Sequence, residues 1–296
     1  MRENPATIVR AFDGSLRDAE GLLAVERATF DEAPYSPAQV RDMLTAGRQR
    51  AWLAQAGDLI AGFVIAFPSF GLHGPCWEID LLAVHPRWTG RGLAARLIRA
   101  ASAHGARLAA WARAAVATEN EPSRRAFTRA GFHAESLPCH LLIYRTDKGE
   151  LAHDAAPGVQ VRPAQGMDEV AKWLAGAATD DLSHPGLSVL VAEQDGRPAG
   201  YVELFDVQTL LYSGLWIESL FAAPAPVRAA LVQAALQRAA AAGLQEVGAM
   251  VPAGQDAWQE TLLALGFRSL GHFYWLVAPL PLPGLASVHG SGEMRD

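Results

Sequence analysis

Hydrophobic and polar positions follow one another in blocks that predict alternating strands and helices. Residues 7–12 (TIVRAF) alternate as a strand does, and residues 16–30 and 36–47 carry apolar residues at helical spacing. A hairpin is predicted next, with strands at residues 51–55 and 60–67 around the turn at Gly57-Asp58.

The pattern then changes to a central strand followed by a helix that packs on the sheet. Residues 76–84 (CWEIDLLAV) form a mostly apolar run, and residues 92–105 place Leu93, Leu97 and Ile98 on one face. Residues 114–120 are strand-like. A helix is predicted from the N-cap Asn120 to the glycine stop at Gly131, and residues 141–146 (LLIYRT) form a last strand.

The chain repeats this pattern once. Residues 51–67 resemble residues 189–205, and the same offset relates IDLLAVHP at residues 79–86 to IESLFAAP at residues 217–224. We therefore expect a tandem duplication of an α+β domain, with a mixed, mostly antiparallel sheet and flanking helices in a three-layer arrangement. The expected domains are residues 1–148 and 158–280, and residues 281–296 are predicted to be a flexible tail.

Composition and charge narrow the classes of protein. Half of the 296 residues are apolar, which predicts packed cores. Residues 1–150 hold 18 basic and 16 acidic residues, whereas the remainder holds 7 and 15. A basic first half suits a phosphorylated ligand, and the acidic second half argues against nucleic acid as a partner. The chain has only two cysteines, without paired spacing, and no secretory leader, so we expect a cytoplasmic protein. No apolar run reaches about 18 residues, so we expect no membrane segment.

Two glycines, Gly90 and Gly92, open the third predicted helix within the sequence HPRWTGRGLAARL. Glycine is costly there unless the backbone must bend sharply or admit a ligand, and the nearby arginines point to an anion. A Walker A loop is excluded because no Gly-Lys-Ser/Thr occurs. A dinucleotide loop fits poorly, since five residues separate strand from loop and no carboxylate follows about 20 residues on.

This arrangement resembles the acyl-CoA site of the GNAT superfamily of N-acetyltransferases. The resemblance lies in Arg87-x-x-Gly90-x-Gly92 behind LLAVHP, in Asn120 with Gly131-Phe132, and in the order of elements. It implies two tandem GNAT domains, acetyl-CoA as co-substrate and a strand edge that pairs with pantetheine. The cofactor-binding residues that it implies are Leu82, Ala83, Val84, Arg87, Gly90, Arg91, Gly92, Leu93, Ala94, Asn120 and Phe127.

Two carboxylates on the strand before this loop are the candidate bases. A free amine is protonated near neutral pH, so attack on a thioester requires a proton acceptor, directly or through water. Glu78 and Asp80 are two residues apart and so share a face of the strand. A shared structural role is the alternative, because Glu218 repeats Asp80. Phe127 stands where family members often carry the tyrosine acid; Tyr144, Cys139, water or unassisted departure are the alternatives.

Residues 29–40 and 68–77 are predicted to be long loops over the acceptor site, with Asp31, Glu32 and Tyr35 as candidates to receive a cationic amine. The second half carries Ala225, Arg228 and Ala230 where the first has Arg87, Gly90 and Gly92, which predicts a degenerate partner.

The predicted function is acetyl transfer to a primary amine of a small molecule or peptide, in the first half. A catalytically silent acyl-CoA-binding module and an interaction protein that binds no CoA are the alternatives. No metal is expected, because the histidines lack ligand spacing with either cysteine. The expected state is a monomer whose two domains form a pseudo-dimer, or a homodimer.

Overall fold

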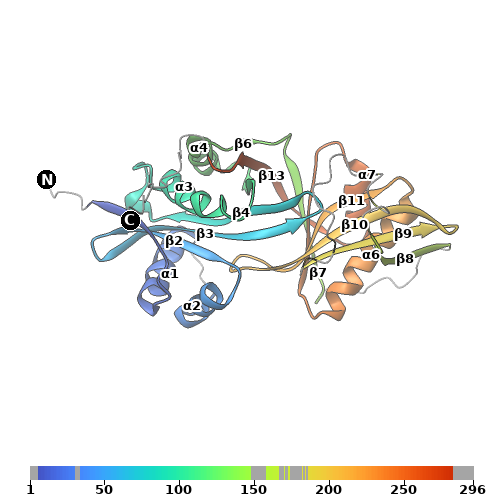
Figure 1. Cartoon of the computed structure of the whole chain (residues 1–296), viewed down its shortest axis with the longest axis horizontal. Helices are drawn as coiled ribbons and strands as arrows, with labels where there is room; N and C mark the ends of the chain where they lie inside the picture. The colour runs from blue at the N-terminus through green and yellow to red at the C-terminus, as the bar shows by residue number, and fades with distance from the viewer. Residues whose placement is uncertain are drawn as a thin grey trace, which may run out of the picture.

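The computed structural model describes residues 6–30, 34–147, 158–166, 170, 173, 182, 184 and 186–282. These residues form one large sheet flanked by helices (Figure 1). The first half of the chain contributes β1 (Thr7–Ala11), α1 (Leu16–Phe30), α2 (Pro37–Ala46), β2 (Arg50–Ala56), β3 (Leu59–Gly71), β4 (Gly74–Val84), the 3₁₀ turn η1 (Pro86–Trp88), α3 (Leu93–Gly105), β5 (Trp111–Ala117), α4 (Glu121–Ala130), β6 (His133–Ala134) and β7 (Cys139–Arg145).

The second half repeats much of this order. Its elements are β8 (Val159–Pro163), β9 (Leu187–Gln194), β10 (Arg197–Gln208), β11 (Ser213–Ala222), α6 (Ala225–Ala241), β12 (Glu246–Val251), α7 (Asp256–Ala264) and β13 (Arg268–Pro279). The register of β3 on β4 shifts between Ile65 and Ala66, and that of β10 on β11 shifts between Glu203 and Leu204. The two irregularities are separated by the offset of the sequence repeat, so the duplication includes the local shape of the strands.

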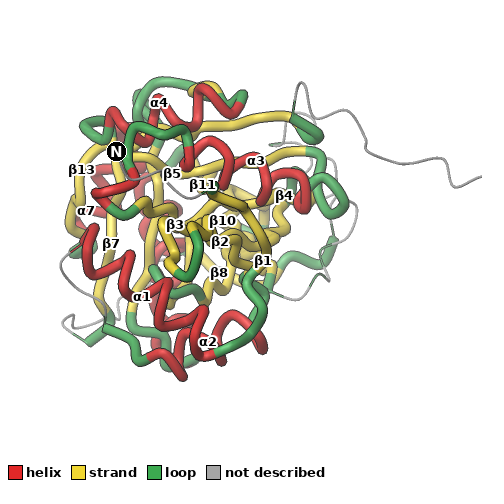
Figure 2. The backbone as a smooth tube through the Cα atoms, turned by 90° about the vertical axis from the view of Figure 1, so that its left-hand side faces the viewer, coloured by secondary structure: helices red, strands yellow, loops and turns green. Residues whose placement is uncertain are grey.

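The helices of the first half cover both faces of its strands. Figure 2 shows α3 and α4 on one side of the sheet and α1 and α2 on the other. The α3 side is packed by Trp77, Ile79, Leu97, Ile98 and Phe127, and the α1 side by Leu22, Leu23, Leu53, Phe63 and Ile65. The three-layer arrangement expected from the periodicity is therefore present.

The two halves exchange their last strands. The strand order is β1-β2-β3-β4-β5-β13-β7-β12-β11-β10-β9-β8, so β13 lies between β5 and β7. β13 pairs with β5 from Pro279↔Trp111 to Phe273↔Ala117, whereas β7 of the first half pairs with β12. Leu276 and Ala278 consequently pack in the core of the first half, and Leu142 and Tyr144 in that of the second. Each core is completed by the other half of the chain.

The tips of two long hairpins also join the halves, because each tip packs against the other half of the chain. Residues 68–77, expected to be a loop, are instead the tip of the β3–β4 hairpin, because the two strands stay paired from Pro68↔Trp77 to Gly71↔Gly74. Leu72 at this tip packs in a second-half cluster with Val189 and Tyr201, while Leu210, at the tip of the β10–β11 hairpin, packs in the α1 core. The Leu72 N–H donates to Glu203 Oε1 and the Leu210 N–H to Gln49 Oε1.

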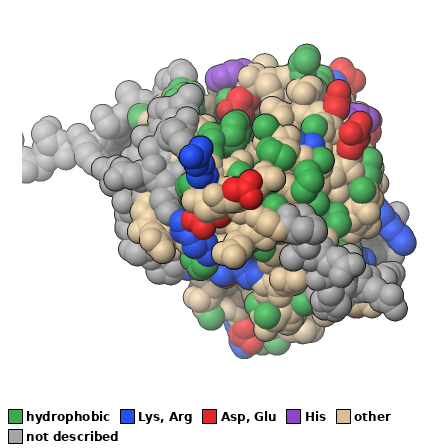
Figure 3. All heavy atoms as spheres, turned by 90° about the vertical axis from the view of Figure 1, so that its right-hand side faces the viewer, with side chains coloured by type: hydrophobic (Ala, Val, Ile, Leu, Met, Phe, Trp, Pro, Cys, Tyr) green, Lys and Arg blue, Asp and Glu red, His purple; other side chains and the backbone are tan. Residues whose placement is uncertain are grey.

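Figure 3 shows the end of the molecule that the second half forms, on the right-hand side of Figure 1. Over the described part of this end, acidic, basic and apolar side chains are intermixed. No helix among the described residues is both long and apolar enough to cross a membrane.

Candidate functional site

The sheet of the first half opens between β4 and β5. These parallel strands pair only from Cys76↔Trp111 to Glu78↔Arg113, although β4 continues to Val84 and β5 to Ala117. The far side of β5 is held along its whole length by β13. The opening therefore has one wall in β4 and another that a strand of the second half keeps in place.

The edge of β4 that faces this opening contains Leu82, Ala83 and Val84. Their other edge pairs with β3 at Val64, Phe63 and Gly62. Gly62 permits the close approach, because a Cβ there would stand 2.8 Å from the Ala83 carbonyl oxygen. Successive residues of a strand point their N–H and C=O groups to opposite edges, and the His85 N–H bonds to the Ala61 carbonyl oxygen on the β3 side. The N–H and C=O groups of Leu82 and Val84 therefore face the opening, with no strand partner among the described residues, whereas those of Ala83 face β3. The edge is available to the amide groups of an extended ligand.

The glycine loop lies at the far end of this edge. Gly90 and Gly92 have φ of +75° and +72°, a conformation that glycine adopts without strain. Apart from the adjacent residues of the chain, no described atom lies within 4 Å of where a Cβ would stand at either glycine. Gly92 is the N-cap of α3 and has no side chain to accept the first N–H groups of the helix. The unsatisfied N–H groups of Leu93 and Ala94 and the positive end of the helix favour an anion here.

The two arginines of the loop are placed differently from each other. The Arg91 guanidinium lies over the Trp88 ring, 4.5 Å from its centroid, and Nη2 donates to the Arg87 carbonyl oxygen at 3.2 Å. Arg87 is exposed, and it lines a cavity beside α1 together with Arg10, Arg17 and Asp58. Arg91 therefore supplies positive charge next to the start of α3, whereas Arg87 lines the cavity beside α1.

Asn120 and Phe127 lie on α4, beside the opening. Asn120 is exposed, and its Oδ1 accepts the Ser123 N–H at 3.1 Å, which makes it the N-cap of α4. Phe127 is 3% exposed and packs edge-to-face on Phe132 at 5.1 Å. Phe127 therefore anchors α4 to the α3 core.

The predicted acceptor-binding residues are only partly described. Asp31 and Glu32 lie outside the described residues. Tyr35 is half-buried and packs against the α1 core, next to the capping box that Ser36 and Gln39 form at the start of α2.

Asp80 is the residue at which β4 bulges. Leu81 pairs with Ile65 and Ile79 with Ala66, so Asp80 has no opposite residue on β3. Its Oδ2 accepts a hydrogen bond of 3.2 Å from Gln49 Nε2. The pKa of Asp80 is raised to about 7, mainly because burial removes the carboxylate from water. A hydrogen bond from Thr209 lowers this pKa and offsets part of the effect of burial. A carboxylate with this pKa exchanges its proton near neutral pH, as a general base must.

Glu78 is placed differently, although it lies two residues away. Its carboxylate accepts hydrogen bonds from Ser69 Oγ and, on both oxygens, from Arg113 Nε at 2.8 and 2.9 Å. Arg113 also donates to both oxygens of Glu218, at 2.5 and 3.0 Å. The side chains of Arg113, Glu78 and Glu218 are 17%, 10% and 20% exposed. Glu78 is thus one end of a nearly buried carboxylate–guanidinium–carboxylate bridge that joins the halves.

The same region holds another buried acid, Glu203. It accepts hydrogen bonds from the Leu72 N–H and from Ser219 Oγ. Burial and the nearby Glu218 carboxylate raise the pKa of Glu203 to about 7. Arg113 therefore supplies positive charge between three carboxylates.

Sequence reasoning did not identify Arg113 or Gln49 as site residues. Arg113 lies just before the strand-like run predicted at residues 114–120, and its two partners are 35 and 105 residues distant in the chain. Gln49 lies just before β2 and is 2% exposed. A buried glutamine needs partners for both its carbonyl oxygen and its amide nitrogen, but the sequence does not say which residues supply them.

The second half has no equivalent glycine loop. Arg228, at the position of Gly90, donates from Nη1 to the carbonyl oxygens of Ala222 and Ala223 at 2.9 and 2.5 Å. Its guanidinium thus occupies the end of β11. Trp216 stands at the position of Glu78, and its Nε1 donates to Glu218 at 3.2 Å.

The two alternative proton donors, Tyr144 and Cys139, are both buried side chains of β7. Tyr144 is buried in the core of the second half against Phe267, because β7 is exchanged. Cys139 is buried, and desolvation raises the pKa of its thiol. Among the described residues no group of three or more His, Cys, Asp or Glu side chains is arranged to hold a metal ion.

Comparisons with known proteins agree with this geometry. Residues 20–132 match the acetyltransferase (GNAT) family. The fold resembles a GCN5-related N-acetyltransferase from Sphaerobacter thermophilus, with a TM-score of 0.59 and 17% identity over 92% of this chain and 95% of that one. It also resembles a tandem GNAT protein from the clavulanic acid biosynthesis pathway, with a TM-score of 0.54 and 14% identity over 93% of this chain and 98% of that one.

A search of curated proteins finds no match. The family match covers the strand edge, the glycine loop and α4, and the structural likeness extends over both halves. Residues 20–132 therefore match the GNAT acetyltransferase family, and the fold of both halves together resembles that of a tandem GNAT protein.

Proposed function

We propose that this protein transfers an acetyl group from acetyl-CoA to a primary amine, and that the reaction takes place in the first half of the chain. The observation that carries this proposal is the opening between β4 and β5, with an unpaired strand edge on one side and the glycine loop at its end. Its shape suits a long ligand that has amide groups at one end and a pyrophosphate at the other.

Acetyl-CoA supplies a thioester whose carbonyl carbon is electrophilic. The edge formed by Leu82 and Val84 orients the pantetheine arm, and the Val84 N–H polarises the acetyl carbonyl. Gly90, Gly92 and the first N–H groups of α3 hold the pyrophosphate, with Arg91 adding positive charge.

Asp80 is the general base of this proposal. The amine nitrogen bonds to the carbonyl carbon, the bond from that carbon to sulfur breaks, and the CoA thiolate leaves. The ammonium form of the amine first gives one proton to the Asp80 carboxylate, and the second proton that the nitrogen loses, as the new bond forms, goes to the departing CoA thiolate through water. Glu78 is already hydrogen-bonded to Ser69 and Arg113, and so it positions the strand rather than accepting the proton.

Substituting Gly90 tests the acyl-CoA site. Calorimetric titration of the wild-type chain with acetyl-CoA is expected to show one site per chain. Gly90→Trp should weaken binding at least tenfold, because a side chain would fill the space left for phosphate and its φ of +75° disfavours non-glycine residues.

Gly57→Trp is the matched control. Gly57 also has a positive φ, +61°, and open surroundings, but it lies in the β2–β3 turn. This variant should bind acetyl-CoA as the wild type does. Two sites per chain would show that the second half also binds acyl-CoA, and no binding by the folded wild type would contradict the proposal.

A further inference from the structure

The tip of the β10–β11 hairpin, residues 208–213, brings the second half of the chain to Asp80 of the first half. Leu210 packs in the α1 core, and its N–H donates to Gln49 Oε1 at 3.1 Å. Gln49 Nε2 in turn donates to Asp80 Oδ2 at 3.2 Å. We propose that this tip controls the ionisation of Asp80, because it fixes the Gln49 amide in the orientation that donates to the carboxylate. The inference rests on the proposed acetyl transfer for the role of Asp80, and it makes Gln49 a positioning residue of that site.

The Gln49 amide has two ends of opposite hydrogen-bonding character. Its oxygen only accepts and its nitrogen only donates, and the side chain is buried, so both ends depend on protein partners. The backbone N–H of Leu210 can only donate, so it takes the amide oxygen and leaves the nitrogen for Asp80. Without that N–H, the amide would be free to turn its oxygen to a protonated Asp80, which would favour the protonated form. The bond from the second half therefore selects the ionised form.

The hairpin tip is held in one conformation by its own hydrogen bonds. The Thr209 N–H donates to the Tyr212 carbonyl oxygen at 2.7 Å. Thr209 Oγ1 accepts the N–H groups of Leu211 and Tyr212 at 3.2 and 2.9 Å. Thr209 and Leu210 are both buried. A closed and buried turn keeps the Leu210 N–H in a fixed direction, as a positioning contact requires.

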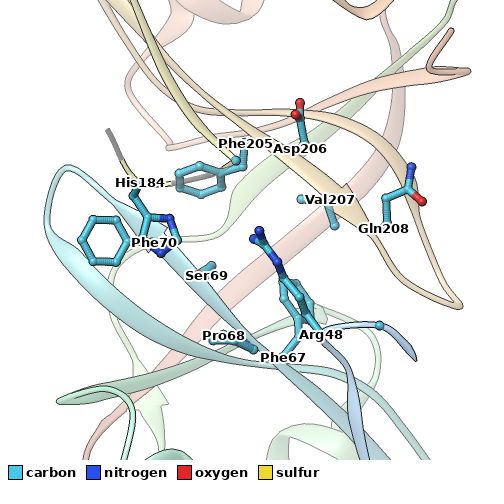
Figure 4. A pocket seen from close by; sticks show the side chains of 12 residues that line it. Arg48, Phe67, Pro68, Ser69, Phe70, His184, Phe205, Asp206, Val207 and Gln208 are labelled. Carbon is cyan, nitrogen blue, oxygen red and sulfur yellow. The ribbon is translucent and has the colours of Figure 1, made fainter. Parts of the chain in front are cut away.

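A cavity of about 360 Å³, the inter-half cavity, lies next to this contact (Figure 4). Its walls include residues 67–70 of β3 and 205–208 of β10. Gln49 and Thr209 each follow a lining residue in the chain, and both interact with Asp80. Since the cavity separates the two strands here, the tip is attached to the first half through its own contacts in the α1 core and through Gln49.

The other groups near Asp80 show why the hairpin matters. Burial and the carboxylate of Glu78, on the same strand, both favour the protonated form of Asp80, whereas Thr209 at the tip favours the ionised form. The Arg113 guanidinium is bound to Glu78 and Glu218. The hairpin therefore lowers a pKa that burial by itself would raise further.

Titration of Asp80 tests the inference without any substrate. The full chain, labelled with carbon-13 at its aspartate carboxyl groups, is titrated by NMR, and the Asp80 signal is the one missing from Asp80→Asn. Gln49→Met and Thr209→Val should each raise the Asp80 midpoint, about 7 in the wild type, by about one pH unit, because each removes a hydrogen bond to the ionised form. A purely structural role would lower stability without moving this midpoint.

Gln55→Met and Thr146→Val are the matched controls. The Gln55 side chain accepts a hydrogen bond from Arg10, and Thr146 donates across the halves to the Leu244 carbonyl oxygen. Both controls should leave the Asp80 midpoint at its wild-type value. An unchanged midpoint in both folded test variants, or an equal shift in the controls, would overturn the inference.

The kinetic profile separates this inference from the proposed function. For an amine that the wild type acetylates, the midpoint of kcat/KM against pH should rise in Gln49→Met by the same amount as the NMR midpoint. A shifted Asp80 midpoint in a chain that acetylates no amine would support the control by the hairpin and contradict the proposed transfer. A shifted NMR midpoint with an unchanged kinetic midpoint would support that control and contradict the role of Asp80 as the base.

Discussion

Replacing Asp80 by asparagine is expected to lower kcat/KM for acetyl transfer by about 10²- to 10⁴-fold, the usual contribution of general acid–base catalysis. The wild-type profile should rise with pH through a midpoint near 7, where Asp80 loses its proton. Asp80→Asn should lose this rise, because an amide cannot accept the proton. Steady-state rates of thiol release between pH 5.5 and 9 measure both effects.

Glu78→Gln distinguishes the two carboxylates of the strand. Because Glu78 is bound to Arg113 and Ser69, this variant should keep the rise near pH 7. An unchanged profile in Asp80→Asn, or loss of the rise in Glu78→Gln alone, would move the base to Glu78.

The same Asp80 substitution should have the opposite effect on stability. The pKa of Asp80 is raised from an ordinary value of 3.8 to about 7 in the folded chain, so the folded state holds this proton more strongly. The stability that Asp80 contributes is full below pH about 4 and is lost as the pH rises through 7. The Asp80→Asn variant does not lose this stability as the pH rises, because its amide does not ionise. It should unfold less readily than the wild type at pH 8, by at most about 4 kcal/mol, with a smaller difference at low pH.

Replacing Arg113 by methionine is expected to lower the free energy of unfolding by about 3–5 kcal/mol, the cost of leaving a buried charge without its partner. Glu78 and Glu218 would both lose the guanidinium that now bridges them. Because these residues belong to different halves, and because the halves also share β7 and β13, we expect a single transition at lower urea concentration. Urea unfolding at pH 7, followed by circular dichroism, measures the shift.

Arg145→Met is the matched control. Arg145 also pairs across the halves, with Glu246 at 2.9 Å, but its side chain is 45% exposed. Loss of an exposed pair costs about 0–1 kcal/mol. Adding Glu78→Gln and Glu218→Gln to Arg113→Met should restore part of the stability, since neutral amides cost less to bury than charges. Equal effects of the two arginine substitutions would show that the Arg113 bridge does not hold the halves together.

Local sequence determined the order of elements and the chemistry of the glycine loop. Apolar periodicity predicted most of the helices and strands, and the requirement for positive φ explains why Gly90 and Gly92 are glycines. Asp80 was also within reach of sequence reasoning, because a carboxylate inside an apolar strand is costly unless it has a role. These features depend on neighbours within a few residues.

How the two halves share strands and side chains depends on contacts between segments that are distant in the chain. The sequence of β7 is that of a strand that closes a domain, and either β5 or β12 could accept it, because backbone hydrogen bonding is the same for both. The bond of Gln49 to Asp80, the bridge through Arg113 and the walls of the inter-half cavity join residues 31 to more than 100 positions apart. Hydrophobic pattern specifies which face of a strand is buried, but not which strand or side chain it meets.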